Sequence, residues 1–194
     1  MSKLQLAVVI GSTREGRFGG QVAKWFADLA SETDLFEIDL VDLKDYGFPQ
    51  EMGQGFPRMG QYPDSIKPFA ERMAKADAFV FVTPEYNHGY PASLKSALDS
   101  IFAEWLAKPA SFISYGGAMG GVRAIEQLRT VAAELHMVDI RDTLSIPFVF
   151  GAFENGKVKD ENYTKSALEI VKQLHWWANT LKKGKEVAPY IPAK

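Results

Sequence analysis

Two short segments carry groups that suit a single bound molecule. Residues 11–14 read GSTR and offer hydroxyl groups, an arginine and exposed backbone N–H groups, which together suit a phosphate. Residues 84–87 read PEYN and offer an aromatic ring, an amide and a proline-stiffened backbone, which suit a flat heteroaromatic ring. Each segment follows a short apolar run, Leu4–Ile10 or Ala78–Val82, of the kind that forms a buried parallel strand. A phosphate joined to a flat ring, with no acid–base or metal-binding group nearby, predicts a flavin nucleotide.

The glycine-rich residues 11–20 (GSTREGRFGG) stand where a strand is expected to pass into a helix. A helix N-terminus presents unpaired N–H groups and the positive end of the helix dipole. The spacing from Gly11 to Gly16 matches a Walker A loop, but Arg17 and Phe18 replace its Lys and Ser/Thr, so nucleoside triphosphate hydrolysis is not expected. The alternative is a plain glycine-rich turn with a solvated arginine.

The segment after the third apolar run could form a platform for the ring. Tyr86 can stack on a flat ring, and Asn87 can both donate to and accept from the polar edge of a flavin. The alternatives are a partly buried loop aromatic for Tyr86 and an Asx turn for Asn87. Glu85 has the alternative of a solvated or helix-capping carboxylate.

A third glycine-rich segment, residues 114–123 (SYGGAMGGVR), follows another apolar run. Four glycines so close to a strand end allow a ligand to approach the backbone closely. The alternative is a tight turn before the next helix. As the third strand-end loop beside two others, the segment supports the same binding site.

Strand-like runs and helical periodicities alternate along the chain. The predicted strands are Leu4–Ile10, Leu35–Leu43, Ala78–Val82, Ala110–Tyr115 and one strand within His136–Ile146. The predicted helices lie around Val22–Ala30, Asp64–Lys75, Pro91–Trp105, Val122–Leu135 and Ala167–Leu181. This alternation predicts an α/β fold of the flavodoxin-like, doubly wound type: a five-stranded parallel sheet of order 2-1-3-4-5 with helices on both faces.

We expect a single domain over residues 1–184 and a C-terminal tail over 185–194. The segment Asp45–Pro63 breaks the rhythm, because it is rich in Pro, Gly, Met and aromatic residues and shows no period. Long loops inside compact domains are usually functional. We therefore expect its aromatic residues to wall a substrate cleft: Tyr46, Phe48, Phe56 and Tyr62.

The composition is that of an ordinary globular protein, with 194 residues, 46% hydrophobic and 24% charged, and a net charge of −2. No basic stripe predicts a nucleic-acid partner, and no apolar run is long enough to predict a membrane span. The chain contains no cysteine, which excludes disulfides and thiol catalysis and fits a reducing compartment. These observations predict a cytoplasmic protein.

Three motifs together resemble the NAD(P)H-dependent FMN reductase family, whose relatives include quinone, azo-dye and chromate reductases. They are GSTR, PEYN followed by P-x-x-L-K-x-A-x-D over residues 91–99, and YGG-x-x-GG-x-R-A over residues 115–124. PEYN with its following helix is the most specific of the three. The resemblance extends from residue 4 to about residue 180.

The resemblance implies a flavodoxin-like fold, noncovalent FMN, NADPH or NADH as co-substrate, a small-molecule electron acceptor, and a homodimer or homotetramer with the flavin near the subunit interface. The predicted cofactor-binding residues are Ser12, Arg14, Arg17, Phe18, Gly19, Pro84, Glu85, Tyr86, Asn87, Ser114, Gly116 and Gly117. No side chain is predicted to be catalytic, since the flavin N5 would accept and donate the hydride.

The chain departs from the family pattern in the phosphate loop. Many members have a serine and an asparagine where this chain has Arg17 and Gly19. Two alternatives follow for Arg17: it replaces the missing phosphate contact by its charge, or it reaches the phosphate of an incoming NADPH.

The predicted function is therefore an NAD(P)H-dependent reductase that passes hydride to bound FMN and then to a quinone, free flavin or similar acceptor in a ping-pong cycle. Backbone N–H groups near Asn87 and Gly116 are expected to stabilise the anionic reduced ring. The alternatives are a flavodoxin-type electron carrier, a flavin-binding sensor and a nucleotide-binding protein without flavin. Arg14 and the small net charge disfavour the carrier.

Overall fold

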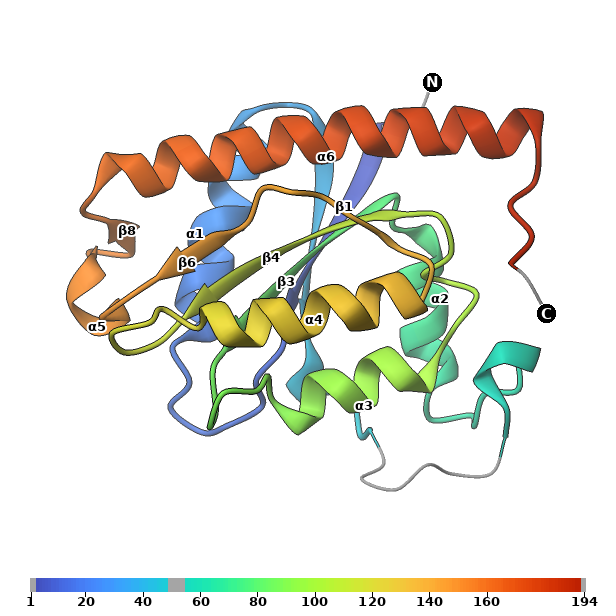
Figure 1. Ribbon diagram of the computed structural model, residues 1–194, viewed down its shortest axis with the longest axis horizontal. Coiled ribbons are helices and arrows are strands. Elements are labelled where there is room, and N and C mark those ends of the chain that lie inside the picture. The colour runs from blue at the N-terminus through green and yellow to red at the C-terminus, as the bar shows by residue number, and fades with distance from the viewer. Residues whose placement is uncertain (1–2, 49–54, 193–194) are drawn as a thin grey trace.

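The computed structural model describes residues 3–48 and 55–192. Apolar runs form the strands β1 (Leu4–Ile10), β2 (Phe36–Asp42), β3 (Ala78–Pro84) and β4 (Pro109–Tyr115). They pair in parallel, and the sheet order is β2-β1-β3-β4-β5 (Figure 1). The predicted fold class and strand order are confirmed.

The last position of the sheet is divided between two short strands, although a single strand was predicted within His136–Ile146. Strand β5 (Val138–Asp139) pairs with Pro109 and Ala110 of β4. Strand β6 (Leu144–Ile146) pairs with β4 further along its length, up to Tyr115.

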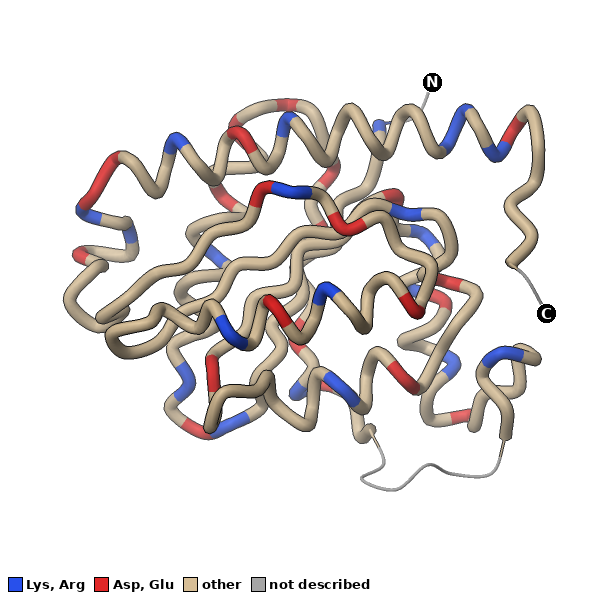
Figure 2. The backbone as a smooth tube through the Cα atoms, in the orientation of Figure 1, with Lys and Arg blue, Asp and Glu red and all other residues tan. Residues whose placement is uncertain are grey.

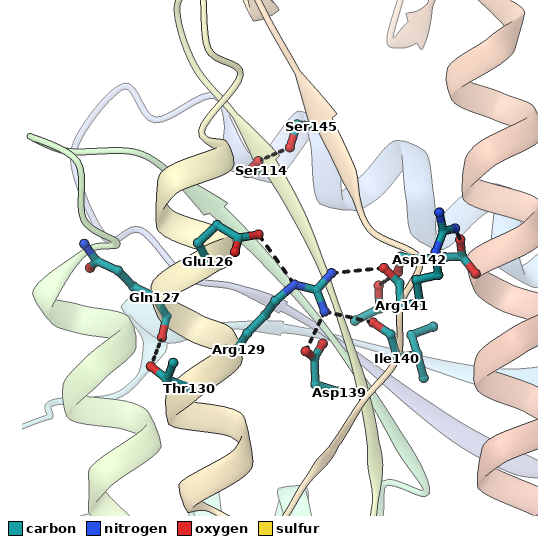
Figure 3. Close-up of polar contacts among 11 residues, drawn as sticks. Ser114, Glu126, Gln127, Arg129, Thr130, Asp139, Ile140, Arg141, Asp142 and Ser145 are labelled. Carbon is teal, nitrogen blue, oxygen red and sulfur yellow. Dashed lines mark hydrogen bonds and ion pairs between the residues drawn. The ribbon is translucent and has the colours of Figure 1, made fainter.

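Side-chain hydrogen bonds hold the chain between β5 and β6. Arg129, on helix α4 (Val122–Glu134), donates to the backbone carbonyl oxygens of Ile140 and Arg141, 3.2 and 3.0 Å away (Figure 3). Its guanidinium also pairs with Asp139 at 2.5 Å. Burial raises the pKa of Asp139, and the adjacent guanidinium partly offsets this effect. The strand is therefore interrupted where the carbonyl groups of Ile140 and Arg141 accept hydrogen bonds from the side chain of Arg129.

Helices cover both faces of the sheet (Figure 1). One face is covered by α1 (Gly19–Glu32) and α6 (Glu161–Val187). The other is covered by α2 (Lys67–Lys75), α3 (Ala92–Ser100) and α4. Within β1, Leu6 and Val8 pack in the first of these cores, while Ala7 and Val9 pack in the second, because successive side chains of a strand point to opposite faces.

Helix α3 is shorter than its apolar pattern predicted. It ends at Ser100, yet Phe102 and Trp105 beyond its end are still buried in the same core. The indole N–H of Trp105 donates to the carbonyl oxygens of Leu98 and Ile101, at 3.0 and 3.1 Å. Trp105 thus shares its one N–H donor between two carbonyl groups of the kind that a helix C-terminus leaves unpaired.

One short helical turn ends at the first residue of the segment Asp45–Pro63, and another lies inside the segment, beyond residues 49–54, which are outside the described residues. The turns are η1 (Leu43–Asp45) and η2 (Pro57–Met59). The remaining short elements are α5 (Val149–Ala152), β7 (Phe153–Glu154) and β8 (Lys157–Val158).

Acidic and basic residues alternate over the backbone without a stripe of one sign (Figure 2). No helix in the described ranges is long and apolar enough to cross a membrane. The cytoplasmic location stays a prediction. Helix α6 continues to Val187, past the position at which the tail was expected to begin.

Candidate functional site

The strand register brings the predicted loops together at the carboxyl edge of the sheet, at the lower left of Figure 1. Ile10 pairs with Val82, so the loops after β1 and β3 begin side by side. Pro84 pairs with Tyr115, and Tyr115 in turn pairs with Ile146 of β6. Four loops therefore leave the sheet next to one another, one more than the sequence predicted.

A cavity of about 560 Å³ opens among these loops, and we call it the strand-end cavity. Its volume is in the usual range for a small-molecule or cofactor site. The predicted residues that line it are Arg14, Arg17, Phe18, Pro84, Glu85, Tyr86, Gly116 and Gly117. A neighbouring cavity of about 750 Å³ shares Arg14 and Tyr86 with it and also contacts Ser12, Tyr46 and Phe48.

The arginines of the first loop have different surroundings. Arg17 forms an ion pair with Asp42 at the end of β2, and its Nε is buried without a hydrogen-bond partner. Arg14 is exposed, and no carboxylate in the described part of the chain pairs with it. Arg14 is therefore available to an anion in the strand-end cavity, whereas Arg17 is already held in place.

A hydrogen bond joins the first loop to the loop after β3. The hydroxyl groups of Ser12 and Tyr86 lie 2.8 Å apart, and Ser12 is only 1% exposed. The backbone N–H of Arg14 approaches the Ser12 hydroxyl at 3.4 Å. Ser12 lies beside the neighbouring cavity, so its predicted role as a phosphate ligand stays a prediction.

The loop after β3 closes in a tight turn. Tyr86 and Gly89 exchange both backbone hydrogen bonds, at 2.8 and 3.0 Å. Asn87 and His88 occupy the two central positions with φ of 49° and 71°. Such a turn requires positive φ at both positions, which Asn tolerates better than most residues. Asn87 is exposed and does not line the strand-end cavity, so the turn accounts for its position.

Glu85 has the helix-capping role that was considered as its alternative. Its carboxylate accepts from the backbone N–H of Arg123 in the first turn of α4 at 3.2 Å, and Arg123 Nη1 donates to it at 2.8 Å. A carboxylate at a helix N-terminus is stabilised by unpaired N–H groups and by the helix dipole. Glu85 therefore fixes the loop after β3 against α4 while lining the cavity.

The glycines after β4 fall into two pairs. Gly120 and Gly121 have positive φ of 59° and 85°, and added Cβ atoms would meet Pro147 N at 2.9 Å and Ser114 Cβ at 2.8 Å. Gly116 and Gly117 line the cavity and have room for a side chain. The turn explains the first pair, and only the second pair leaves space beside the backbone for a ligand.

Two further predicted residues lie beside the cavity rather than in it. Ser114 is buried, and its hydroxyl donates to the carbonyl oxygen of Gly120 at 2.8 Å. Gly19 packs against the hydroxyl of Tyr115. The N–H of Gly116 itself is not free for a ligand, because it donates to the carbonyl oxygen of Ile146 at 3.2 Å. The expected stabilisation of the ring by backbone N–H groups near Gly116 stays a prediction.

The sequence reasoning missed the loop after β6. Phe148, Val149, Phe150 and Gly151 line the strand-end cavity, and Phe148 has a left-handed backbone with φ of 46°. Their backbone is tied to the glycine loop, since Val149 N–H donates to the carbonyl oxygen of Gly116 at 3.2 Å. The apolar letters PFVFG after the last predicted strand were the available signal.

Of the aromatic residues expected to wall a cleft, Tyr46 and Phe48 line the neighbouring cavity. Tyr62 is directed elsewhere, because its hydroxyl donates to Glu104 at 2.8 Å and accepts from Phe102 N–H at 3.2 Å. Phe56 is 67% exposed. No group of His, Cys, Asp and Glu suited to a metal ion occurs among the residues that the structure describes.

Comparison with known proteins agrees with this geometry. The sequence profile of the family described as NADPH-dependent FMN reductase matches residues 4–151. The chain is 40% identical over 136 residues to an NAD(P)H-dependent FMN reductase of Schizosaccharomyces pombe, covering 69% of this chain and 68% of that protein. It is 30% identical over 200 residues to the NAD(P)H-dependent FMN reductase ntnL of Nectria sp, covering 94% and 99%.

Among solved structures, the flavoenzyme NAD(P)H:(acceptor) oxidoreductase FerB from Paracoccus denitrificans superposes with a TM-score of 0.73 at 23% identity, over 91% of this chain and 98% of that one. This likeness supports the flavodoxin-like fold. The profile match and the S. pombe relative go further and confirm the resemblance seen in the motifs. The chain belongs to the NADPH-dependent FMN reductase family.

Proposed function

We propose that this protein is an NAD(P)H-dependent oxidoreductase that holds FMN in the strand-end cavity and reduces a quinone, a free flavin or a similar acceptor. The observation that carries the proposal is the junction of a basic, glycine-rich helix N-terminus and an open glycine backbone within one cavity. When bound, FMN supplies the redox chemistry, by accepting a hydride from the nicotinamide and passing it on.

The residues of the cavity fit FMN at both of its ends. Arg14 and the N-terminus of α1 offer charge and N–H donors to a phosphate. Gly116 and Gly117 leave backbone uncovered on the opposite side, where a flat ring needs close approach. Pro84 and Tyr86 provide apolar surface between the two ends. We assign FMN binding to these residues on that basis.

Each part of the site then has a stated task. Arg14 binds the phosphate, and the ion pair between Glu85 and Arg123 keeps the loop after β3 in position for the ring. Among the backbone N–H groups near Gly116, we assign that of Gly117 as a donor to the polar edge of the ring. The protein needs no general base, because the transfer of a hydride to a flavin does not require a side chain to remove a proton.

The neighbouring cavity extends this proposal to the second substrate. It lies across Tyr86 from the strand-end cavity and combines the exposed Arg14 and Lys44 with the aromatic rings of Tyr46 and Phe48. Cations beside aromatic surface suit a nucleotide that carries phosphates and a flat base. We propose that it forms part of the cleft for NAD(P)H and the acceptor.

The test is steady-state kinetics of FMN-loaded protein with NADPH and a quinone. The proposal predicts NADPH oxidation without any partner reductase and parallel double-reciprocal lines, because the oxidised nucleotide leaves before the acceptor binds. Intersecting lines would remove the ping-pong cycle and leave the reductase. A protein that binds FMN but does not oxidise NADPH would instead be an electron carrier or a sensor.

We also propose a homo-oligomer, a homodimer or homotetramer. Large aromatic side chains are unusually exposed in the isolated chain: Phe148 is 68%, Phe150 81% and Trp176 58% accessible. Exposed apolar groups of this size often mark contacts between subunits. Sedimentation velocity checks the proposal, and a single species at the monomer mass would exclude it.

A further inference from the structure

The first turn of α1 is only partly supplied with acceptors: the N–H of Gln21 donates to the carbonyl oxygen of Phe18 at 3.0 Å, and the N–H of Gly19 faces the hydroxyl oxygen of Tyr115. Its N-cap, Phe18, makes no side-chain capping bond, and the turn contains no acidic residue. The opening N–H groups of any helix lack partners within the helix. In α1 they lie beside the strand-end cavity, which Arg17 and Phe18 line.

The hydroxyl of Tyr115 reaches the same turn from the end of a neighbouring strand. Tyr115 ends β4, lines the cavity and is only 5% exposed. Its hydroxyl lies so close to α1 that a Cβ on Gly19 would stand 2.5 Å from the oxygen. The hydroxyl forms no hydrogen bond with an acceptor among the described residues.

The hydroxyl is also held in its donor form. Burial raises the pKa of Tyr115, and the nearby Tyr86 adds to the effect, while the backbone N–H of Gly19 and the charge of Arg17 oppose it. The oxygen faces an N–H group and a cation, so its proton is the part left without a partner.

Arg17 brings a second unused donor to this place. Its outer guanidinium nitrogen pairs with Asp42, which fixes the side chain, but its Nε is buried without a partner. A buried donor without an acceptor costs about 1–3 kcal/mol, so most buried donors in folded proteins are paired. The buried Nε of Arg17 and the cavity-lining hydroxyl of Tyr115 lie beside a helix start that has no side-chain cap. Together they indicate a shared acceptor, and an anion fits all three features.

We propose that Tyr115 is a phosphate-binding residue, whose hydroxyl donates a hydrogen bond to the FMN phosphate at the first turn of α1, beside Nε of Arg17. Gly19 belongs to the same arrangement, because any side chain at this position would displace the hydroxyl. This inference rests on the proposed binding of FMN.

The test compares FMN with riboflavin, which has the same ring and ribityl chain but no phosphate. Tyr115→Phe removes only the hydroxyl. Its FMN affinity is expected to fall about 10- to 100-fold, the range for a hydrogen bond to a charged group, while its riboflavin affinity stays as in the wild type. Fluorescence quenching of each flavin measures both values without turnover.

Tyr62→Phe is the matched control, because it also removes a partly buried tyrosine hydroxyl but one that bonds Glu104 outside both cavities. Its affinities for FMN and riboflavin are expected to match the wild type. Equal losses of both flavins in Tyr115→Phe would overturn the proposal, and so would an unchanged FMN affinity. A wild-type protein that binds neither flavin would refute the proposed function as well.

Gly19→Ala tests the arrangement from the helix side and serves if Tyr115→Phe does not fold. The added Cβ displaces the hydroxyl, so FMN affinity falls while riboflavin affinity does not. The double variant with Tyr115→Phe is expected to bind FMN no more weakly than the weaker single variant, because both changes remove one contact. If the loss of FMN affinity in the double variant equals the product of the losses in the two single variants, Gly19 and Tyr115 act independently, contrary to the proposal.

Discussion

Within the site, single side chains with similar chemistry serve different ends because of their neighbours. Arg17 and Arg123 each face a carboxylate, Asp42 or Glu85, and are fixed by it. Arg14 has no such partner in the described residues and lies between the two cavities. It is therefore the arginine whose full charge reaches a ligand.

Replacing Arg14 by Ala is expected to weaken FMN binding by about 1.5–3 kcal/mol, the value of a charge-assisted hydrogen bond, and to leave riboflavin binding nearly unchanged. Isothermal titration with each flavin measures the difference. Arg141→Ala is a suitable control, because Arg141 is a well-exposed arginine remote from the cavities. An FMN affinity equal to that of the wild type would remove Arg14 from the phosphate site.

Lys108 is a buried cation far from the site. Its ammonium donates to the carbonyl oxygens of Met73 and Ala74, at 3.0 and 3.1 Å, at the end of α2. Burial lowers the pKa of Lys108 from 10.5 to about 8, with a smaller contribution from Lys185 and an opposing one from Asp77. Between these pH values the unfolded chain binds more protons than the folded one, so stability rises with pH.

The prediction is a comparison of the wild type with Lys108→Met. Across pH 8 to 10.5 the free energy of unfolding of the wild type should increase relative to that of the variant, by about 3 kcal/mol in total. Urea unfolding of both proteins at several pH values gives the difference between their free energies of unfolding. Groups other than Lys108 titrate in both proteins, so their contributions cancel in this difference. A constant difference would mean that the ammonium is not strained by burial.

At the scale of elements, the loop after β4 separates glycines that shape the turn from glycines that leave room. Gly121→Ala is expected to lower the free energy of unfolding by about 2–4 kcal/mol, since it combines φ of 85° with a contact at 2.8 Å to Ser114 Cβ. Gly117→Ala is the matched control and should change it by less than about 1 kcal/mol, because open space surrounds the position. Similar losses in both variants would contradict this division.

The strands that carry the site were predictable because each is a short apolar run that ends in a polar or glycine-rich segment. Leu4–Ile10 was predicted with its observed bounds. Helix α3 was predicted to be longer than it is, because Trp105 is apolar and continues the spacing of the buried helical residues. The chain has left the helix after Ser100, but Trp105 is still buried in the same core. Apolar spacing reports burial, and burial continues past the end of a helix.

The last strand and its loop could not be derived from pattern alone. The break between β5 and β6 depends on Arg129, which lies on a different element and bonds the intervening carbonyl groups. Tyr115 was visible in its motif, but its approach to Gly19 is a contact between β4 and α1. Local patterns predict which loops meet, whereas long-range contacts decide which atoms face the ligand.

At the scale of the whole molecule, FMN binding should appear as a gain in stability. The site joins loops from β1, β3, β4 and β6, so unfolding any of them releases the ligand. FMN at about 100 times its Kd should stabilise the fold by about 2.7 kcal/mol and raise Tm by about 5–10 °C. Differential scanning calorimetry checks this, and a Tm independent of FMN would contradict binding to the folded state.

The hydrogen bond between Ser12 and Tyr86 has a thermodynamic consequence for ligands smaller than the whole cofactor. The bond couples the loop after β1 to the loop after β3. A fragment that orders one of these loops therefore also favours the bound conformation of the other. Ribitol phosphate and lumichrome, added together, should therefore each bind more tightly than either does alone. In the variant Ser12→Ala, which lacks this hydrogen bond, the affinity for each fragment should no longer depend on whether the other is bound.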